Sequence, residues 1–242
     1  MNEAGWNGKM KNLGALSEIW ISPMHLVGPA ASLMFAQPLQ PAETATDEDP
    51  PGWDKREEGW SIEELLGQYN SQKKTITLFN KGIKHAAEQL IIPVEGLRYV
   101  VRLHEWGHAV FHLGVNRGVS AELAGAMLAD DDDLIESTVK KLTKIYNSVQ
   151  EYVHEQIAQV ITKLALEELR AGATFEESKA ASETLLSRFE TLTKRQPPRY
   201  RIDQFRDLRR EQLQSRLQSV IDLIREDCIR GNEKTWNTIM AW

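Results

Sequence analysis

The chain has 242 residues, carries a formal net charge of -6 at pH 7 and contains one cysteine. This length permits a substantial core, and the acidic balance argues against a protein that mainly binds nucleic acid. With Cys228 alone, an intrachain disulfide and a cysteine-rich metal site are both excluded, so we expect a cytoplasmic protein in which histidine and carboxylate hold any metal. No run of about twenty apolar residues predicts a membrane span.

The N-terminal residues 1–60 lack the periodicity of a helix or a strand. Nearly half of the nine prolines fall between Pro38 and Pro51, close to a short acidic cluster at residues 47–49. This composition predicts an irregular tail. Its tryptophans favour packing of part of the tail on the core or on a partner.

Regular elements are expected from residue 61 onward. Residues 61–64 resemble a capping box and predict a short helix that includes Tyr69. After a polar turn, β-branched and apolar residues predict a strand made of Thr75, Ile76, Thr77, Leu78 and Phe79. A helix over about residues 83–90 follows. A longer helix is then expected to begin at Pro93 and to end near Gly114.

The second half of the chain is predicted to be helical. Residues 130–133 are successive aspartates without the spaced ligands and glycine of an EF-hand loop, so they favour a solvated helix start. Apolar spacing from Leu134 to about Arg170 predicts one long helix or two abutting ones. Another helix should open near Thr174 and close before Pro197. A last long helix is expected to begin near Asp203.

The motif His104-Glu105-Trp106-Gly107-His108 lies in the middle of the helix predicted after Pro93. On a helix, residues i and i+4 share a face, so His104 and His108 can bind one metal ion while Glu105 projects beside it. This HExxH pattern is typical of zinc hydrolases, in which the glutamate is the general base. We therefore expect one zinc ion per chain and Glu105 as the catalytic residue.

A catalytic zinc needs a further protein ligand and an open position for water. His112 lies about 12 Å from His104 along the helix axis and is not expected to reach the same ion. Glu155 is the preferred ligand because Ala158, a small residue one turn later, would let two helices approach closely. The alternatives in the same segment are Glu151 and His154.

The order of these features resembles the minimal gluzincin domains of the ImmA/IrrE metallopeptidases. It comprises the strand at residues 75–79, a helix, the motif with its following Ala109 and His112, and residues 155–159, which read Glu-Gln-Ile-Ala-Gln. The resemblance covers about residues 61–165. It implies a helix-rich α+β fold with a small sheet, in which a zincin-like core spans residues 61–170 and a helical extension spans residues 171–242.

The resemblance also implies an activity, the hydrolysis of peptide bonds in a specific protein target such as a regulatory protein. Zinc held by His104, His108 and Glu155 would lower the pKa of its water, and Glu105 would move the proton to the leaving amine. The strand Thr75–Phe79 would bind substrate as an added strand at the edge of the sheet. Tyr152 and His112 are both candidates for oxyanion stabilisation.

A second function of another class is a catalytically silent, zincin-like binding module. Arginines outnumber acidic residues over residues 199–216, so the C-terminal helices could meet an acidic protein or nucleic acid. Glu105 favours the enzyme, because a structural zinc site has no need of a general base. The oligomeric state does not follow from the sequence.

Overall fold

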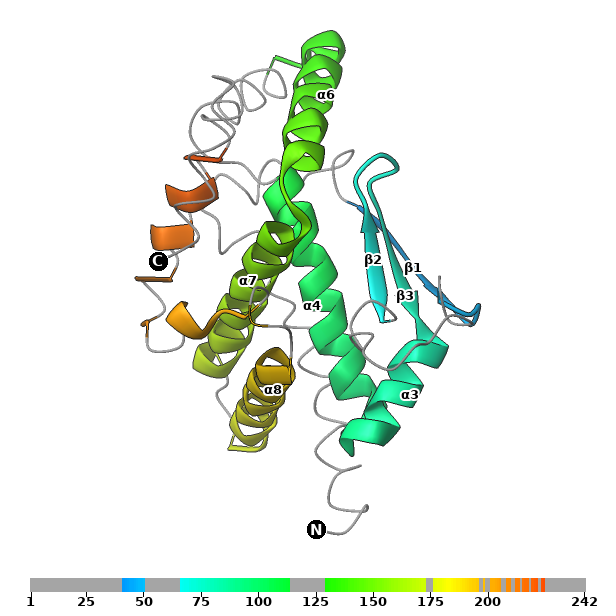
Figure 1. Ribbon diagram of the computed structural model, residues 1–242, viewed down its shortest axis with the longest axis vertical. Helices are drawn as coiled ribbons and strands as arrows, with labels where there is room; N and C mark the ends of the chain where they lie inside the picture. Colours follow the sequence, from blue (N-terminus) through cyan, green and yellow to red (C-terminus); the bar gives the residue numbers. More distant parts are fainter. Residues whose placement is uncertain are drawn as a thin grey trace.

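The computed structural model describes residues 41–50, 66–113, 129–172 and 176–195, residue 198, and separate residues between 201 and 224. Within these ranges the protein is helix-rich α+β, as the sequence predicts. A small sheet lies on one side of the long helix α4 (Val94–Leu113), and α7 (Glu151–Gly172) and α8 (Glu176–Arg195) lie on the other (Figure 1). None of the described helices is both long and apolar enough to cross a membrane.

The sheet has the strand order β1-β3-β2. Its central strand β3 (Thr75–Phe79) pairs in parallel with β1 (Ala42–Thr46) and antiparallel with β2 (Gly67–Asn70). The predicted strand is therefore confirmed, with Ile76 and Leu78 buried on one face as its period of two requires.

Two expectations for the N-terminal half were wrong. Residues 42–46, expected within the irregular tail, form β1, whose exposed and mostly polar side chains give no apolar alternation in the sequence. The Glu43 carboxylate holds this strand to α4, accepting hydrogen bonds from Arg102 Nε at 2.7 Å and from Trp106 Nε1 at 3.0 Å.

The short helix expected to include Tyr69 is replaced there by β2, because pairing with β3 overrides the local capping signal. Residues 61–65, which carry that signal, lie outside the described residues.

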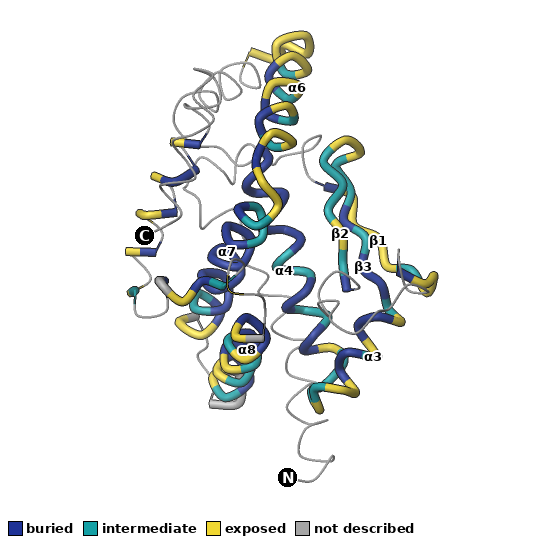
Figure 2. Tube along the Cα trace, viewed as in Figure 1, coloured by how far each residue is buried: buried dark blue, intermediate teal, exposed yellow. Residues whose placement is uncertain are grey.

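Helix α3 (Asn80–Leu90) begins directly after β3, slightly earlier than predicted, and ends at Ile91 in the left-handed conformation with φ 54°. Helix α4 follows and confirms the predicted motif helix. Figure 2 shows that α4 is buried along most of its length, as expected for the central element of the core.

The segment from residue 132 to residue 172 forms two helices, one of the two arrangements that the sequence allowed. Helix α6 (Asp132–Ser148) ends at Val149, whose extended backbone separates it from α7. The side chain of Asp131 caps α6 by accepting a 3.0 Å hydrogen bond from the backbone N–H of Leu134. With Asp132 and Asp133 in the first turn, the acidic run is a capped helix start.

The described residues of the C-terminal extension pack onto α7 and share one hydrophobic cluster with the rest of the described chain. A short 3-10 helix, η5 (Asp203–Phe205), lies where a long helix was expected to begin. Lys163 Nζ donates to the backbone carbonyl of Phe205 at 3.1 Å and so holds η5 against α7. The apolar stripe predicted beyond it is buried, at Leu213, Leu217, Val220 and Ile224.

Candidate metal centre

The motif helix and α7 bring three side chains to one point. His104 and His108 lie on successive turns of α4, with their Nε2 atoms 3.2 Å apart. From α7, Glu155 places Oε2 at 3.0 Å from His104 Nε2 and Oε1 at 3.4 Å from His108 Nε2. The structure thus brings together the three residues that the sequence analysis chose as metal ligands.

The donor set and its spacing fit a zinc ion. Zinc binds imidazole nitrogen and carboxylate oxygen at about 2.0–2.2 Å, so ligand atoms around a tetrahedral ion lie about 3.3 Å apart. The two Nε2 atoms are 3.2 Å apart, and each lies 3.0 or 3.4 Å from a different oxygen of the Glu155 carboxylate, distances close to that value. Burial acts to raise the pKa of Glu155, but His108 and His104 hold that pKa well below its usual range. Glu155 is therefore a carboxylate, the form that binds metal.

The alternative ligands do not join this group. Glu151 is exposed at the start of α7. The imidazole of His154 lies with its centroid 4.1 Å from the ring of Tyr146, and its Nε2 donates to the backbone carbonyl of Val149 at 3.1 Å. Burial lowers the pKa of His154 to about 4, so this side chain is neutral at pH 7. Neither residue belongs to the ligand group found among the described residues.

Glycine at position 107 permits the approach of the two ligand-bearing helices. A Cβ atom on Gly107 would lie 2.8 Å from both Cα and O of Ala158, which is closer than such atoms can pack. Ala158 is the small residue from which the sequence predicted a close approach, and Gly107 is its counterpart within the motif. This contact fixes the distance from Glu155 to the two histidines.

The general-base candidate is held by strand β2. Glu105 is 5% exposed, and its carboxylate accepts a hydrogen bond from the backbone N–H of Tyr69. A Cβ atom on Gly67 would lie 2.8 Å from both Cγ and Oε1 of Glu105, so glycine leaves the space that this side chain fills. Burial raises the pKa of Glu105, and the adjacent histidines oppose that rise. Sequence reasoning missed this support because a helix was expected at β2.

Tyr146, near the end of α6, supports one histidine from behind. Its hydroxyl oxygen lies 3.4 Å from His108 Nδ1. When Nε2 faces the metal position, Nδ1 carries the proton and donates to this oxygen, which fixes the orientation of the ring. Burial raises the pKa of Tyr146 well above its usual value, so it is a neutral phenol. No motif in the sequence identified this residue.

His112 belongs to a separate chain of hydrogen bonds. Thr143 Oγ1 donates to the carbonyl of Val139 at 2.8 Å, so its oxygen accepts from His112 Nε2 at 2.9 Å. The other ring nitrogen, Nδ1, then accepts from the Tyr69 hydroxyl at 2.8 Å. His112 is 1% exposed and ties β2, α4 and α6 together. This structural role argues against the expectation that His112 stabilises an oxyanion.

The predicted substrate strand needs correction. β3, which comprises Thr75–Phe79, is hydrogen-bonded to a neighbour on each side and has no edge for an added strand. The sequence could not reveal this, because the two flanking strands carry no clear strand pattern. β2 lies at the edge of the described sheet and is the strand that contacts Glu105.

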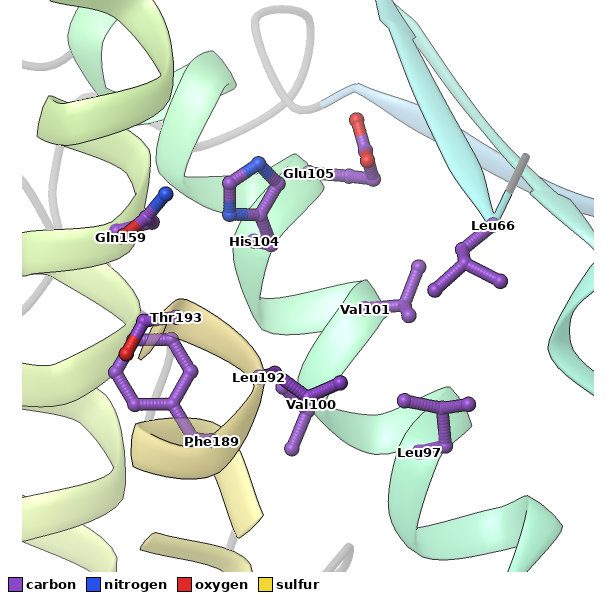
Figure 3. Close-up of a pocket in the computed structure, with 10 residues that line it drawn as sticks. All are labelled: Leu66, Leu97, Val100, Val101, His104, Glu105, Gln159, Phe189, Leu192 and Thr193. Atoms are coloured by element: carbon purple, nitrogen blue, oxygen red, sulfur yellow. The ribbon is translucent and has the colours of Figure 1, made fainter. Parts of the chain in front are cut away.

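A pocket lies beside His104 and Glu105 (Figure 3). The empty space in and around it is about 420 Å³, which includes open solvent. His104, Glu105 and Gln159 form its polar end, and the remaining lining is apolar apart from Thr193. The apolar residues come from α4, α8 and the residue before β2: Leu66, Leu97, Val100, Val101, Phe189 and Leu192.

Comparisons with protein-family models, with curated proteins and with solved structures found no match. The chemical interpretation of the site therefore depends on its own geometry.

The ligand assignment predicts the metal content of single variants. Wild type should bind about one zinc ion per chain. Both His104→Ala and Glu155→Ala should lose it, because two ligands hold zinc far more weakly than three. Elemental analysis after zinc reconstitution and dialysis measures the ratio. Glu151→Ala is the matched control and should keep its zinc; loss of zinc in this variant but not in Glu155→Ala would contradict the assignment.

The close contact of α4 and α7 predicts an unusual effect of a Gly→Ala change. Alanine normally stabilises a helix by about 1 kcal/mol relative to glycine. Gly107→Ala should instead lower the melting temperature and weaken zinc binding, because the added methyl group pushes Ala158 and therefore Glu155 away from the histidines. Thermal unfolding with and without zinc tests this. A stabilised variant with unchanged zinc affinity would show that the helices can separate freely.

The contact between Tyr146 and His108 predicts a variant that binds zinc more weakly but remains folded. Tyr146→Phe keeps the ring and removes the hydroxyl group, so zinc affinity should fall about tenfold to a hundredfold with little loss of fold stability. Competition with a chelator of known affinity measures this change. Tyr152→Phe, the same substitution on α7, is the control. Equal affinities in the two variants would remove Tyr146 from the metal site.

Proposed function

We propose that the protein is a zinc-dependent metallopeptidase of the gluzincin type, similar to the ImmA/IrrE metallopeptidases, that hydrolyses peptide bonds in a protein or peptide target. The observation that carries this proposal is the convergence of His104, His108 and Glu155 directly beside the buried Glu105. A helix-rich core with a small sheet next to the motif helix is consistent with it.

The chain supplies both the ligands and the proton carrier for this reaction. A bound zinc ion would polarise the peptide carbonyl and lower the pKa of water. Glu105 takes a proton from the attacking water as the new C–O bond forms. It then gives that proton to the amide nitrogen as the C–N bond breaks, which yields a carboxylic acid and an amine. Contacts with β2 hold Glu105 in place throughout.

Strand β2 is the better candidate for binding the substrate backbone. The backbone N–H of Phe79 donates to the carbonyl of Leu66 at 3.0 Å, so alternate residues from Leu66 onward bond to β3. The backbone groups of Gly67 and Tyr69 consequently point away from β3. Since the Tyr69 N–H donates to Glu105, the groups left for a peptide are those of Gly67 and the carbonyl of Tyr69. A peptide added along this edge would run beside β2, close to Glu105.

The binding-module alternative finds less support in the described residues. Its working surface would be the C-terminal helices, whose apolar stripe is buried against the rest of the protein. Arg209 and Arg216 are exposed, as on an ordinary solvated helix face. A buried carboxylate beside three ligand groups, by contrast, has a direct use in hydrolysis.

The proposed function predicts a separation of metal binding from activity. Zinc-loaded wild type should cleave peptides in a complex mixture, and mass spectrometry of the new termini measures the cleavage. Glu105→Gln should keep zinc but lose cleavage by about a factor of 10²–10⁴, because the amide cannot accept the proton. Glu151→Gln serves as the matched control with full activity. Zinc-loaded wild type that cleaves nothing would favour a binding module, whereas Glu105→Gln with normal activity would remove Glu105 from the mechanism.

A further inference from the structure

The pocket beside the metal centre points to the substrate class. We infer that it binds a large apolar side chain, such as leucine, phenylalanine or methionine, of a substrate residue next to the scissile bond. Helix α8, which belongs to the C-terminal extension, sets the size of the side chain that fits. This inference depends on the proposed peptidase activity and specifies what that activity prefers.

The pocket begins where the chemistry would take place. His104 and Glu105 both line it, so the pocket adjoins one ligand of the metal position and the general base. Leu97 lies on the same helix about 10 Å before His104, which gives the pocket a depth comparable to a long side chain. Figure 3 shows the apolar side chains of α4 lying beyond the two site residues, away from Gln159. A substrate residue next to the scissile bond can therefore direct its side chain into this space.

Helix α8 forms the opposite wall. Phe189, Leu192 and Thr193 have the spacing i, i+3 and i+4, so one face of α8 supplies all three. Thr193 Oγ1 donates to the backbone carbonyl of Glu190 at 3.1 Å, so its hydroxyl is engaged by its own helix. The α8 wall is therefore mainly hydrocarbon and aromatic.

The lining also determines which side chains are unfavourable. Among the described residues that line the pocket, Glu105 is the only acidic one, and none is lysine or arginine. An aspartate or glutamate side chain would lose its hydration without gaining a cation and would lie near the Glu105 carboxylate. A polar uncharged side chain would lose hydrogen bonds to water along the apolar walls. Burial of a leucine-sized side chain should favour cleavage about tenfold to a hundredfold over a small or polar one.

The test combines substrate profiling with two opposite changes on α8. Zinc-loaded wild type, Leu192→Ala and Thr193→Leu would each digest the same mixture of proteome-derived peptides, and mass spectrometry would give the residues on both sides of each cut. Leu192→Ala enlarges the pocket and should shift preference toward phenylalanine and tryptophan. Thr193→Leu fills it and should shift preference toward valine and alanine. Thr191→Leu makes the same substitution as Thr193→Leu at an exposed position of α8, and should match wild type.

A binding measurement separates the pocket from catalysis. Zinc-loaded Glu105→Gln should bind a peptide with leucine at the preferred position about tenfold or more tightly than the same peptide with aspartate there. Thr193→Leu in that background should reduce this difference. Thermal unfolding of each α8 variant confirms that it is folded before the profiles are compared.

The outcomes distinguish failure of the inferred side-chain preference from failure of the proposed peptidase activity. An apolar preference on one side of the cut, moved in opposite directions by Leu192→Ala and Thr193→Leu, supports the inference. Cleavage without an apolar preference, or a profile that neither α8 variant changes, overturns the inference and leaves the peptidase intact. Absence of any cleavage by zinc-loaded wild type overturns both.

Discussion

The contact between α4 and α7 at Gly107 and Ala158 is the constraint on which the rest of the site depends. Two helices normally pack with side chains between them, at axis distances of about 8–10 Å. Here the absence of a side chain at Gly107 lets the backbone of Ala158 come against α4. One turn earlier on α7, Glu155 therefore reaches both histidines with its two carboxylate oxygens.

Helix α4 directs side chains with different roles toward each of its neighbours. The two histidines face α7, and Glu105 faces β2. The metal ligand His104 and the general base Glu105 are adjacent in the sequence but are therefore held by different elements. Toward α8, helix α4 presents the apolar residues that line the pocket. Tyr146 of α6 holds His108 from behind. Each property of the site, namely metal affinity, proton transfer and substrate choice, therefore has its own supporting element and can change without altering the motif.

The sequence predicted those parts of the site that depend on local spacing. His104, Glu105 and His108 follow from the HExxH motif and its spacing on a helix. Glu155 was chosen because of the small residue at position 158, whose close approach to α4 the structure confirms. The missed parts arise from pairing between distant segments. Residues 67–70 read Gly-Gln-Tyr-Asn and contain neither an apolar run nor alternation, and only pairing with β3 makes them a strand. Three further features also depend on tertiary packing and cannot be found from spacing within one element. They are the central position of β3 in the sheet, the contact of Tyr146 with His108, and the side of the pocket formed by α8.

The ligand group is divided between two helices, with His104 and Glu155 separated by 51 positions in the chain. A metal ion bound by this group would act as a crosslink across a long loop and would bind the folded state only. At a free concentration a hundred times its dissociation constant, such an ion stabilises the folded state by about 2.7 kcal/mol. That amount is a large fraction of the net stability of an ordinary domain. The supply of metal would then control how much of the protein persists in the cell as well as how active it is, since the metal-free chain unfolds more often and is exposed to degradation.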